Sequence, residues 1–328
     1  MAASVDRIPT DSQAESIYFL NAGAAQAEQD RLNRQHRLFD DMMQNDLLPP
    51  HIASALATSP TPPKVLEIAT GTAVWLTEVA KTLRPDAEFV GLDYDISKFP
   101  TSLPPNVTLR QADMFKPFPS DLLGKFDVVN VRLIIFALKE GQGTDLVKNL
   151  MTLLKPGGYV VWAETGPGMY QIFSSSSSWN LLLNDFSCNT KLTLFVLLTT
   201  VEPPSPAWFK FQEINWKFAR KVGRDLNLPI GMVAYIKEAG CVECDDKAYP
   251  GNSQLYTRGR DEWIARTNLH VKALAEQSLR GITSLGGVEG MTTQEEVDGL
   301  LASFEEEFKD RKVHYLFIRA WGRKPEAA

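Results

Sequence analysis

The fold is decided by the stretch Lys64-Val-Leu-Glu-Ile-Ala-Thr-Gly-Thr-Ala-Val-Trp75. Its first six residues, 64–69, form a short apolar run that predicts a buried strand. Residues 73–83 have the spacing of a helix, which Arg84-Pro85 ends. A glycine-containing turn between a strand and a helix N-terminus lets a ligand approach the backbone, because amide N–H groups face it. The stretch therefore predicts a ligand-binding turn at the edge of an α/β sheet.

The alternation of apolar runs and helical segments continues along the chain. Four more apolar runs predict strands, and they cover 87–93, 107–112, 126–131 and 159–164. A helix is expected over 145–154 and a turn at 155–158. Runs this apolar are typical of parallel strands that helices cover on both faces. We expect a Rossmann-like, doubly wound α/β sheet, mostly parallel with an antiparallel last strand over 313–321, plus N-terminal helices and helical insertions.

We expect the chain to divide into an N-terminal helical part and a core. Residues 1–62 predict an N-terminal helical lid, with helical spacing over 12–48 and Pro49-Pro50 as its end. Residues 63–328 are expected to form the core, which carries helical insertions at about 166–230 and 260–310. The later elements predicted within it are helices over 230–239, 261–280 and 293–309 and a sixth strand over 241–249.

Composition limits the classes of partner. The 328 residues have a formal net charge of −6 and no cluster of Lys and Arg, which argues against nucleic acid as a partner. The longest strongly apolar stretch, Leu192 to Val201, is too short to span a bilayer, and the N-terminus does not resemble a secretory signal. We therefore expect a cytoplasmic protein with no membrane partner. Cys241 and Cys244 form a CxxC pair without two further ligands nearby, so no metal site is expected.

Three acidic residues lie at successive strand ends. Glu67 precedes the turn, where a carboxylate repels a pyrophosphate but holds an amino group or a cation. Asp93 ends the second strand, where an acid accepts hydrogen bonds from ribose hydroxyls. Asp113 follows the third strand and can accept from an adenine amine, with Met114 and Phe115 beside the ring. The set matches one ligand with an ammonium, a ribose and an adenine, although each residue alone also fits a core or turn position.

With these residues in place, the chain resembles the class I S-adenosylmethionine-dependent methyltransferases, and more narrowly the gliotoxin N-methyltransferase-like proteins of fungal secondary metabolism. The segments that carry the resemblance are Arg31-Leu-Asn-Arg-Gln-His36, Thr70-Gly-Thr-Ala-Val-Trp75, Phe126-Asp-Val-Val-Asn-Val-Arg132, Lys155-Pro-Gly-Gly158 and Gly322-Arg-Lys-Pro325. The resemblance implies S-adenosyl-L-methionine as cofactor and a small-molecule substrate. The cofactor-binding residues that it implies are Glu67, Ala69, Thr70, Gly71, Trp75, Asp93, Tyr94, Asp113, Met114, Phe115, Val131 and Arg132.

The turn departs from that family's pattern. Where the family motif has three glycines, this chain has Ala69, Gly71 and Ala73. Alanine adds a methyl group near the cofactor and restricts φ, which is tolerable if these positions keep φ below zero. We expect cofactor binding to be weakened rather than lost.

Methyl transfer from a sulfonium is an in-line displacement, which needs a general base only for a hydroxyl or a protonated amine acceptor. His36, on the N-terminal helix, and Arg132, just past the fourth strand, are the residues expected to touch cofactor or substrate. A salt bridge to a neighbouring acid is the alternative for Arg132. His314, which begins the last strand, is expected to be structural.

The acceptor site and the reaction stay open. Aromatic residues of the first insertion can line an acceptor pocket, pack an added helix on the core or form a homodimer contact; they are Trp179, Trp208, Phe209, Phe211 and Trp216. The serine run at 174–178 predicts a flexible loop. Three functions fit: O-, N- or C-methyl transfer to a small molecule in a biosynthetic pathway, a cyclisation or rearrangement by a relative that keeps the cofactor, and regulation by a protein on the same fold.

Overall fold

The computed structural model describes residues 25–165, 169–171, 195–197, 199–202, 204–226, 228–250, 253–309 and 311–326. The helical pattern before residue 25, the serine run at 174–178 and Trp179 lie outside these described residues. None of the described helices is both long enough and apolar enough to cross a bilayer.

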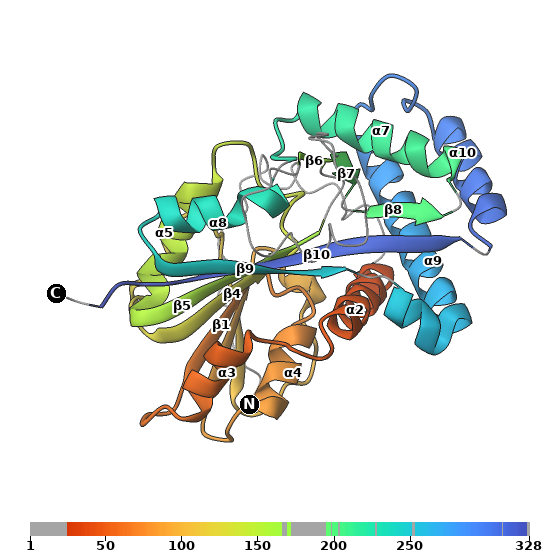
Figure 1. Ribbon diagram of the computed structural model, residues 1–328. Coiled ribbons are helices and arrows are strands. Elements are labelled where there is room, and N and C mark those ends of the chain that lie inside the picture. Colours follow the sequence, from red (N-terminus) through yellow and green to blue (C-terminus); the bar gives the residue numbers. More distant parts are fainter. Residues whose placement is uncertain are drawn as a thin grey trace, which may run out of the picture.

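One sheet of eight strands organises the molecule, in the order β3-β2-β1-β4-β5-β10-β8 with β9 beside β10 (Figure 1). Neighbouring strands from β3 to β5 are parallel, and β10 runs antiparallel to β5, β8 and β9. The predicted doubly wound sheet with an antiparallel last strand is therefore confirmed. Its strands are β1 (Lys64–Ile68), β2 (Glu88–Asp93), β3 (Val107–Gln111), β4 (Phe126–Arg132), β5 (Leu154–Glu164), β8 (Thr199–Glu202), β9 (Val242–Pro250) and β10 (Lys312–Arg323). A separate pair consists of β6 (Met169–Gln171) and β7 (Phe195–Leu197).

The strand order reverses between β1 and β4. From β1 the chain proceeds outward through β2 to β3, then returns to place β4 and β5 on the other side of β1. In open α/β sheets, the carboxyl ends of the strands on either side of such a reversal leave a crevice for a ligand. The topology alone therefore directs attention to the residues that follow β1, β2, β3 and β4.

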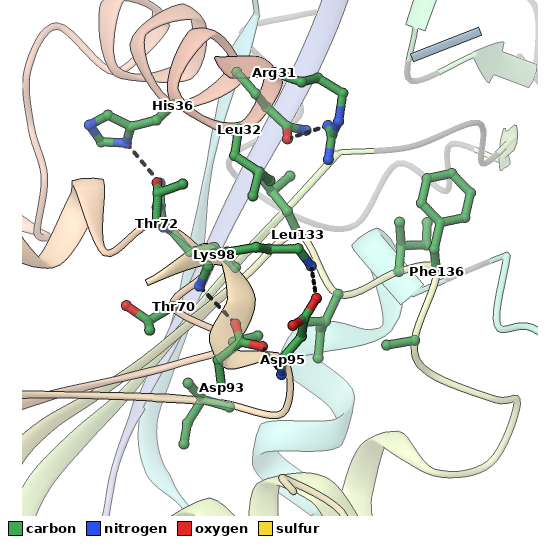
Figure 2. Close-up of a pocket in the computed structure, with 18 of the residues that line it drawn as sticks. Arg31, Leu32, His36, Thr70, Thr72, Asp93, Asp95, Lys98, Leu133 and Phe136 are labelled. Carbon is green, nitrogen blue, oxygen red and sulfur yellow. Dashed lines mark hydrogen bonds and ion pairs between the residues drawn. The ribbon is translucent and has the colours of Figure 1, made fainter. Parts of the chain in front are cut away.

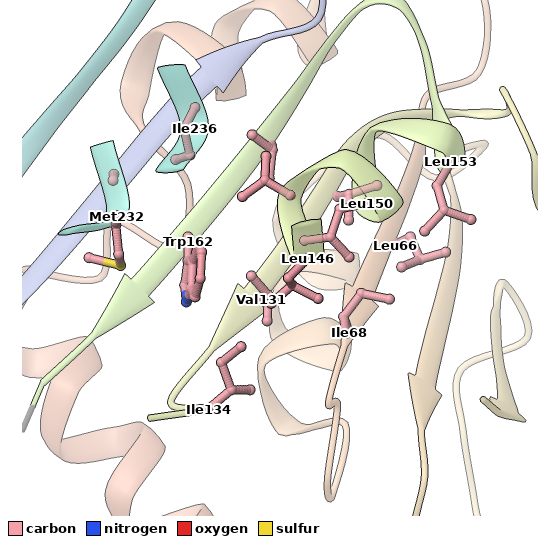
Figure 3. Close-up of a cluster of buried hydrophobic side chains, with 14 of the residues drawn as sticks. Leu66, Ile68, Val131, Ile134, Leu146, Leu150, Leu153, Trp162, Met232 and Ile236 are labelled. Atoms are coloured by element: carbon pink, nitrogen blue, oxygen red, sulfur yellow. The ribbon is translucent and has the colours of Figure 1, made fainter. Parts of the chain in front are cut away.

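Helices cover both faces of this sheet. The helices are α2 (Ala25–Met42), α3 (Pro50–Ala57), α4 (Val74–Thr82), α5 (Gly143–Leu153), α7 (Pro206–Lys221), α8 (Leu228–Glu238), α9 (Ser253–Ser284) and α10 (Gln294–Glu307), with short 3-10 turns at Ile96–Lys98 and Ser120–Leu122. Because strand side chains alternate between the faces, Val65 packs with α3 and α4 while Leu66 packs with α5 and α8. Figure 3 shows the second of these clusters, in which Ile68 and Val131 of the sheet meet Leu146 and Leu150 of α5.

The helical insertions form a third cluster at one end of the sheet. α7, α9 and α10 lie together there, away from α3 and α4 (Figure 1). Phe211 of α7 meets Phe304 of α10 edge to face, with ring centroids 5.8 Å apart. Phe39 of α2 belongs to the same cluster and stacks on Phe317 of β10 at 4.6 Å. The N-terminal helix α2 is therefore tied to the insertions as well as to the sheet.

Some predicted boundaries were wrong. The helix that was expected to run to residue 48 and stop at Pro49-Pro50 ends at Met42. Pro50 instead begins α3, because proline fits the first helical turn, where its missing N–H would have no partner. Pro206 likewise begins α7, behind a Ser205 side chain that accepts from the Trp208 amide. The predicted turn at 155–158 lies within the span of β5, where Gly157 adopts φ +76°.

Candidate active site

A pocket of about 300 Å³ opens at the strand reversal. Its floor is made by the carboxyl ends of β1, β2 and β4 and by the segments that follow β1, β2, β3 and β4. The rest of its wall includes residues of α2, α7 and α9, Thr165 after β5 and Tyr315 of β10. In Figure 2, Arg31, Leu32 and His36 of α2 lie opposite Thr70 and Asp93 of the sheet edge. The pocket therefore brings together segments that are more than two hundred residues apart in the sequence.

The turn after β1 is wound in the left-handed region. Ala69, Gly71 and Ala73 have φ of +53°, +55° and +55°. The condition under which the two alanines were expected to be tolerated, a negative φ, is therefore not met. The turn reverses tightly enough for the Ala73 amide to donate to the Thr70 carbonyl at 2.8 Å, and α4 then starts directly after Ala73. Both alanines consequently hold a conformation that costs an L-residue about 1–2 kcal/mol.

Close packing against two neighbours holds this turn in place. A Cβ atom at Gly71 would lie 3.2 Å from Leu32 Cδ1 of α2, so the helix lies directly over the turn. Gly91 of β2 lies beneath it, where a Cβ would be 2.5 Å from Leu109 Cδ2 and 2.9 Å from Thr70 Cγ2. The sequence motifs did not identify Gly91 as part of the site, although the lack of a side chain at Gly91 makes room for the Thr70 side chain.

Glu67 forms a buried cluster with Thr70 and Arg132. Thr70 Oγ1 donates to Glu67 Oε2 at 2.6 Å, and Arg132 Nη2 lies 3.2 Å from Glu67 Oε1. Burial raises the pKa of Glu67 to about 7, although Arg132 and Thr70 oppose the rise. The salt bridge that was the alternative for Arg132 is thus present, and both Glu67 and Arg132 line the pocket.

Asp93 ties the end of β2 to the turn. One of its carboxylate oxygens accepts from the Gly71 amide at 2.7 Å and the other from the Asp95 amide at 2.9 Å. Burial raises the pKa of Asp93, and the charge of Lys98 and these two amides oppose the rise. Each oxygen keeps a second lone pair, and Asp93 and Tyr94 both line the pocket.

The third predicted acid, Asp113, also lines the pocket but supports a turn. Its Oδ1 accepts a hydrogen bond from the Phe115 amide at 2.9 Å, so Asp113 caps a turn. A turn position was the alternative expected for this acid. Met114 is partly buried against the core, and Asn149 of α5 donates to its carbonyl at 2.9 Å. Phe115 is 43% exposed, so it borders the pocket with a ring that is largely in solvent.

His36 is held by two charged partners. Its Nε2 lies 2.6 Å from Glu78 Oε2 of α4, and its Nδ1 lies 3.3 Å from Arg132 Nη1. Burial and the charge of Arg132 lower the pKa of His36 to about 4, against the effect of Glu78, so the ring is neutral at physiological pH. Asp40 and Glu78 each place an oxygen within 4.8 Å of a His36 ring nitrogen. Arg132 beside the ring disfavours a cation there, and we assign no metal to these three residues.

Two residues of the predicted set lie outside the pocket wall. Val131 points into the core cluster beneath the sheet, because in β4 it alternates with residues that face the other way. Trp75 is 1% exposed, and its Nε1 donates to the Leu47 carbonyl at 3.1 Å. The Arg132 guanidinium lies 5.5 Å from the centre of that indole ring, so Trp75 supports a pocket residue from behind.

The helical insertions contribute pocket residues that the sequence motifs did not identify. His270 and Leu274 reach the pocket from α9, and Gln212 reaches it from α7. No local motif marks these positions, since the insertions reach the sheet edge only through tertiary packing. His314 pairs with Thr200 across β10 and β8 and is not among the lining residues.

The predicted aromatic residues of α7 divide into two groups. Trp208 and Phe211 line the pocket and also belong to the buried cluster of the insertions. Phe209 is 49% exposed, and Trp216 lies beneath the Arg220 guanidinium at 5.9 Å from its ring centre. The lining and packing roles that were alternatives are therefore both found on one helix.

Known proteins resemble this chain to different extents. No family model matches it. It is 35% identical to methyltransferase grgD of a Penicillium species over 162 residues, which make up 47% of this chain and 54% of that protein. The match thus spans about half the length of that relative. N-methyltransferase tcpN of Claviceps purpurea is 25% identical over 302 residues, 91% of this chain and 95% of tcpN.

One similar solved structure is phosphoethanolamine N-methyltransferase 2 of Haemonchus contortus in complex with S-adenosyl-L-methionine. The alignment covers 84% of this chain and 52% of that chain. The sequence identity is 16% and the TM-score is 0.41. The fold assignment therefore depends on the strand order given above. The two fungal relatives carry the sequence relationship, and the chain is similar to the methyltransferases of fungal secondary metabolism, as its motifs indicated.

Proposed function

We propose that this chain is an S-adenosyl-L-methionine-dependent methyltransferase that acts on a small-molecule acceptor of secondary metabolism. The observation that carries the proposal is the convergence of Glu67, Asp93 and Asp113, from three successive strand ends, on one pocket at the strand reversal. The names of the fungal relatives support the same reaction class.

The pocket fits a ligand that is cationic at one end and aromatic at the other. Its lining includes four acidic side chains against three basic ones, so it does not present the positive field that a nucleotide phosphate requires. Ala112, Met114 and Phe118 supply apolar surface beside Asp113 for a flat ring. Asp93 offers the lone pairs that two ribose hydroxyls need.

The chain's own residues would bind and orient the reactants. When bound, the cofactor supplies an electrophilic methyl group on a sulfonium. Asp93 would hold the ribose, and Asp113 and Met114 would flank the adenine. The backbone turn around Gly71 would face the methionine portion, with the Glu67–Arg132 pair offering an acceptor to its ammonium and a donor to its carboxylate. Helix α2 covers the turn and so excludes water from the reacting centre, which aids an in-line displacement.

Calorimetric titration with S-adenosylhomocysteine tests the cofactor site. The wild-type protein is expected to bind, and Asp93→Asn is expected to weaken binding by roughly 1–3 kcal/mol, because an uncharged amide oxygen replaces a carboxylate that holds two hydroxyls. Asp121→Asn is the matched control, since Asp121 pairs with Arg110 on the surface and does not line the pocket. No binding by the wild-type protein, or equal affinity in the Asp93 variant, would contradict the assignment.

Candidate secondary metabolites are then incubated with and without the protein and S-adenosylmethionine, and mass spectrometry of the products tests the reaction. A product heavier by one methyl group supports methyl transfer. An isomeric product would instead support a cyclisation or rearrangement, and binding without any product would favour a regulatory role.

A further inference from the structure

A series of polar contacts connects α4 and α2 to the pocket through Arg132. Glu78 Oε2 of α4 lies 2.6 Å from His36 Nε2 of α2, and His36 Nδ1 lies 3.3 Å from Arg132 Nη1. Arg132 Nη2 in turn lies 3.2 Å from Glu67 Oε1 of β1. His36 and Arg132 line the pocket, whereas Glu78 does not. We call Glu78, His36 and Arg132 together the polar link.

These contacts decide which nitrogen of His36 carries the proton. A guanidinium has N–H donors and no acceptor, so Nδ1 of His36 accepts from Arg132. The ring is neutral, because burial and the charge of Arg132 lower the pKa of His36 to about 4. Its single N–H is therefore at Nε2, which donates to the Glu78 carboxylate. Glu78 thus stabilises the tautomer that the contact with Arg132 requires.

Arg132 is held by three neighbours but keeps donors for a ligand. Its Nη atoms contact Glu67 and His36, and its guanidinium carbon lies 5.5 Å from the centre of the Trp75 ring. Each Nη carries two hydrogens, so one on each remains after these contacts. The side chain is 11% exposed and lines the pocket. A neutral imidazole occupies Nη1 without adding a second negative charge, so Arg132 stays suited to a ligand carboxylate.

We propose that His36 and Glu78 are positioning residues, which aim the Arg132 guanidinium at the carboxylate of the methyl donor's amino-acid portion. The inference rests on the proposed function and adds to it the roles of these two residues. His36 belongs to the helix that covers the Gly71 turn. The placement of α2 over the turn therefore also orients Arg132.

The same contacts exclude His36 as a general base toward the methyl acceptor. A base needs a lone pair that can take a proton from the substrate. The only lone pair of the neutral ring is on Nδ1 and faces Arg132. A proton added there would put a second cation against the guanidinium, which like charges disfavour. His36 therefore acts through Arg132 and not on the acceptor.

Two ligands that differ only in the carboxylate test the proposal. They are S-adenosylhomocysteine and decarboxylated S-adenosylhomocysteine, which keeps the adenosine, the thioether and the amine. Calorimetry on the full chain gives both dissociation constants for the wild-type protein, His36→Leu, His36→Asn, Glu78→Leu and Glu78→Gln. Asp41→Asn is the control, because it removes a different acidic contact of α2, 2.5 Å from Arg266 of α9, and Asp41 does not line the pocket.

The wild-type protein and Asp41→Asn are expected to bind S-adenosylhomocysteine about tenfold or more tightly than the decarboxylated ligand. His36→Leu and Glu78→Leu should lose most of this preference, with the affinity for the decarboxylated ligand within about threefold of the wild-type value. His36→Asn should keep most of the preference, because its amide oxygen takes the place of Nδ1. Glu78→Gln should keep it as well, because its amide oxygen still accepts from Nε2.

An unchanged preference in the leucine variants would overturn the inference. An equal loss of affinity for both ligands would do so too, since that is the result of a purely structural contact between α2 and α4. If His36→Leu does not fold, Glu78→Leu decides, because Glu78 has 34% of its side chain exposed. Equal binding of both ligands by the wild-type protein would overturn the inference and leave the proposed cofactor in place. Binding of neither ligand would overturn the proposed function and the inference together.

The tautomer of His36 can be measured without a ligand. Long-range proton–nitrogen correlation spectra of the full chain with isotope-labelled histidine show which ring nitrogen is protonated at neutral pH. Comparison with His36→Asn identifies the His36 signals. The wild-type protein is expected to carry the proton on Nε2 alone. A proton on Nδ1, with or without one on Nε2, would overturn the inference.

Discussion

The left-handed alanines make a quantitative prediction about stability. Ala69→Gly removes a conformational cost of about 1–2 kcal/mol, because Ala69 has φ +53°. Glycine adds about 0.4–1 kcal/mol of backbone entropy to the unfolded chain, which offsets part of the gain. The free energy of unfolding should therefore rise by about 0.5–1 kcal/mol, and the melting temperature by about 1–4 °C for a chain of this size.

Ala73→Gly should behave differently although Ala73 has nearly the same φ, +55°. The Ala73 methyl group is fully buried in the cluster beneath α3 and α4, and deleting a buried methyl costs about 0.8 kcal/mol. The loss of burial and the relief of the backbone should nearly cancel. Ala80→Gly, inside α4, is the control, where glycine should cost about 1 kcal/mol.

Thermal and urea unfolding of the three variants measure these differences. Ala69→Gly should also keep its dissociation constant for S-adenosylhomocysteine within about threefold of the wild-type value, because Glu67 and Asp93 are untouched. If Ala69→Gly destabilised the protein as much as Ala80→Gly does, the claim that the positive φ of Ala69 strains the backbone would be refuted.

Two further predictions concern the neighbourhood of the site. Burial raises the pKa of Glu164 to about 8. The stability contributed by its protonated carboxyl is therefore full below pH about 4.5 and is lost as the pH rises through 8, by at most about 5 kcal/mol. Urea unfolding between pH 5.5 and 9 should therefore show a smaller loss of stability in Glu164→Gln than in the wild-type protein, and equal slopes would contradict this. Gly91→Ala should lower the free energy of unfolding by about 1–3 kcal/mol, because its Cβ would overlap Leu109 and Thr70; an unchanged melting temperature would show that β2 has room there.

Local patterns sufficed to predict the sheet and the acids at its edge. Apolar runs of strand length, interrupted by helical spacing, placed the five parallel strands, and each acid was recognised by its position at or near the carboxyl end of a strand. The pairing of those strands then brought Glu67, Asp93 and Asp113 to one pocket without further information.

Features that depend on contacts distant in the sequence could not be predicted in this way. Ala69 and Ala73 adopt a positive φ in a turn that lies beneath α2, although alanine itself disfavours that conformation. The partner of His36 is Glu78, 42 residues away. His270 reaches the pocket only because a long helix of the insertion packs against α2. Sequence spacing carries no signal for these contacts.

A crystal structure of the protein with S-adenosylhomocysteine tests the central claim most directly. The account predicts an Asp93 carboxylate oxygen within hydrogen-bond distance of each ribose hydroxyl, the adenine beside Asp113 and Met114, and the amino-acid portion at the Gly71 turn. A nucleoside that lies elsewhere on the molecule, or in the pocket with its ribose away from Asp93, would contradict it.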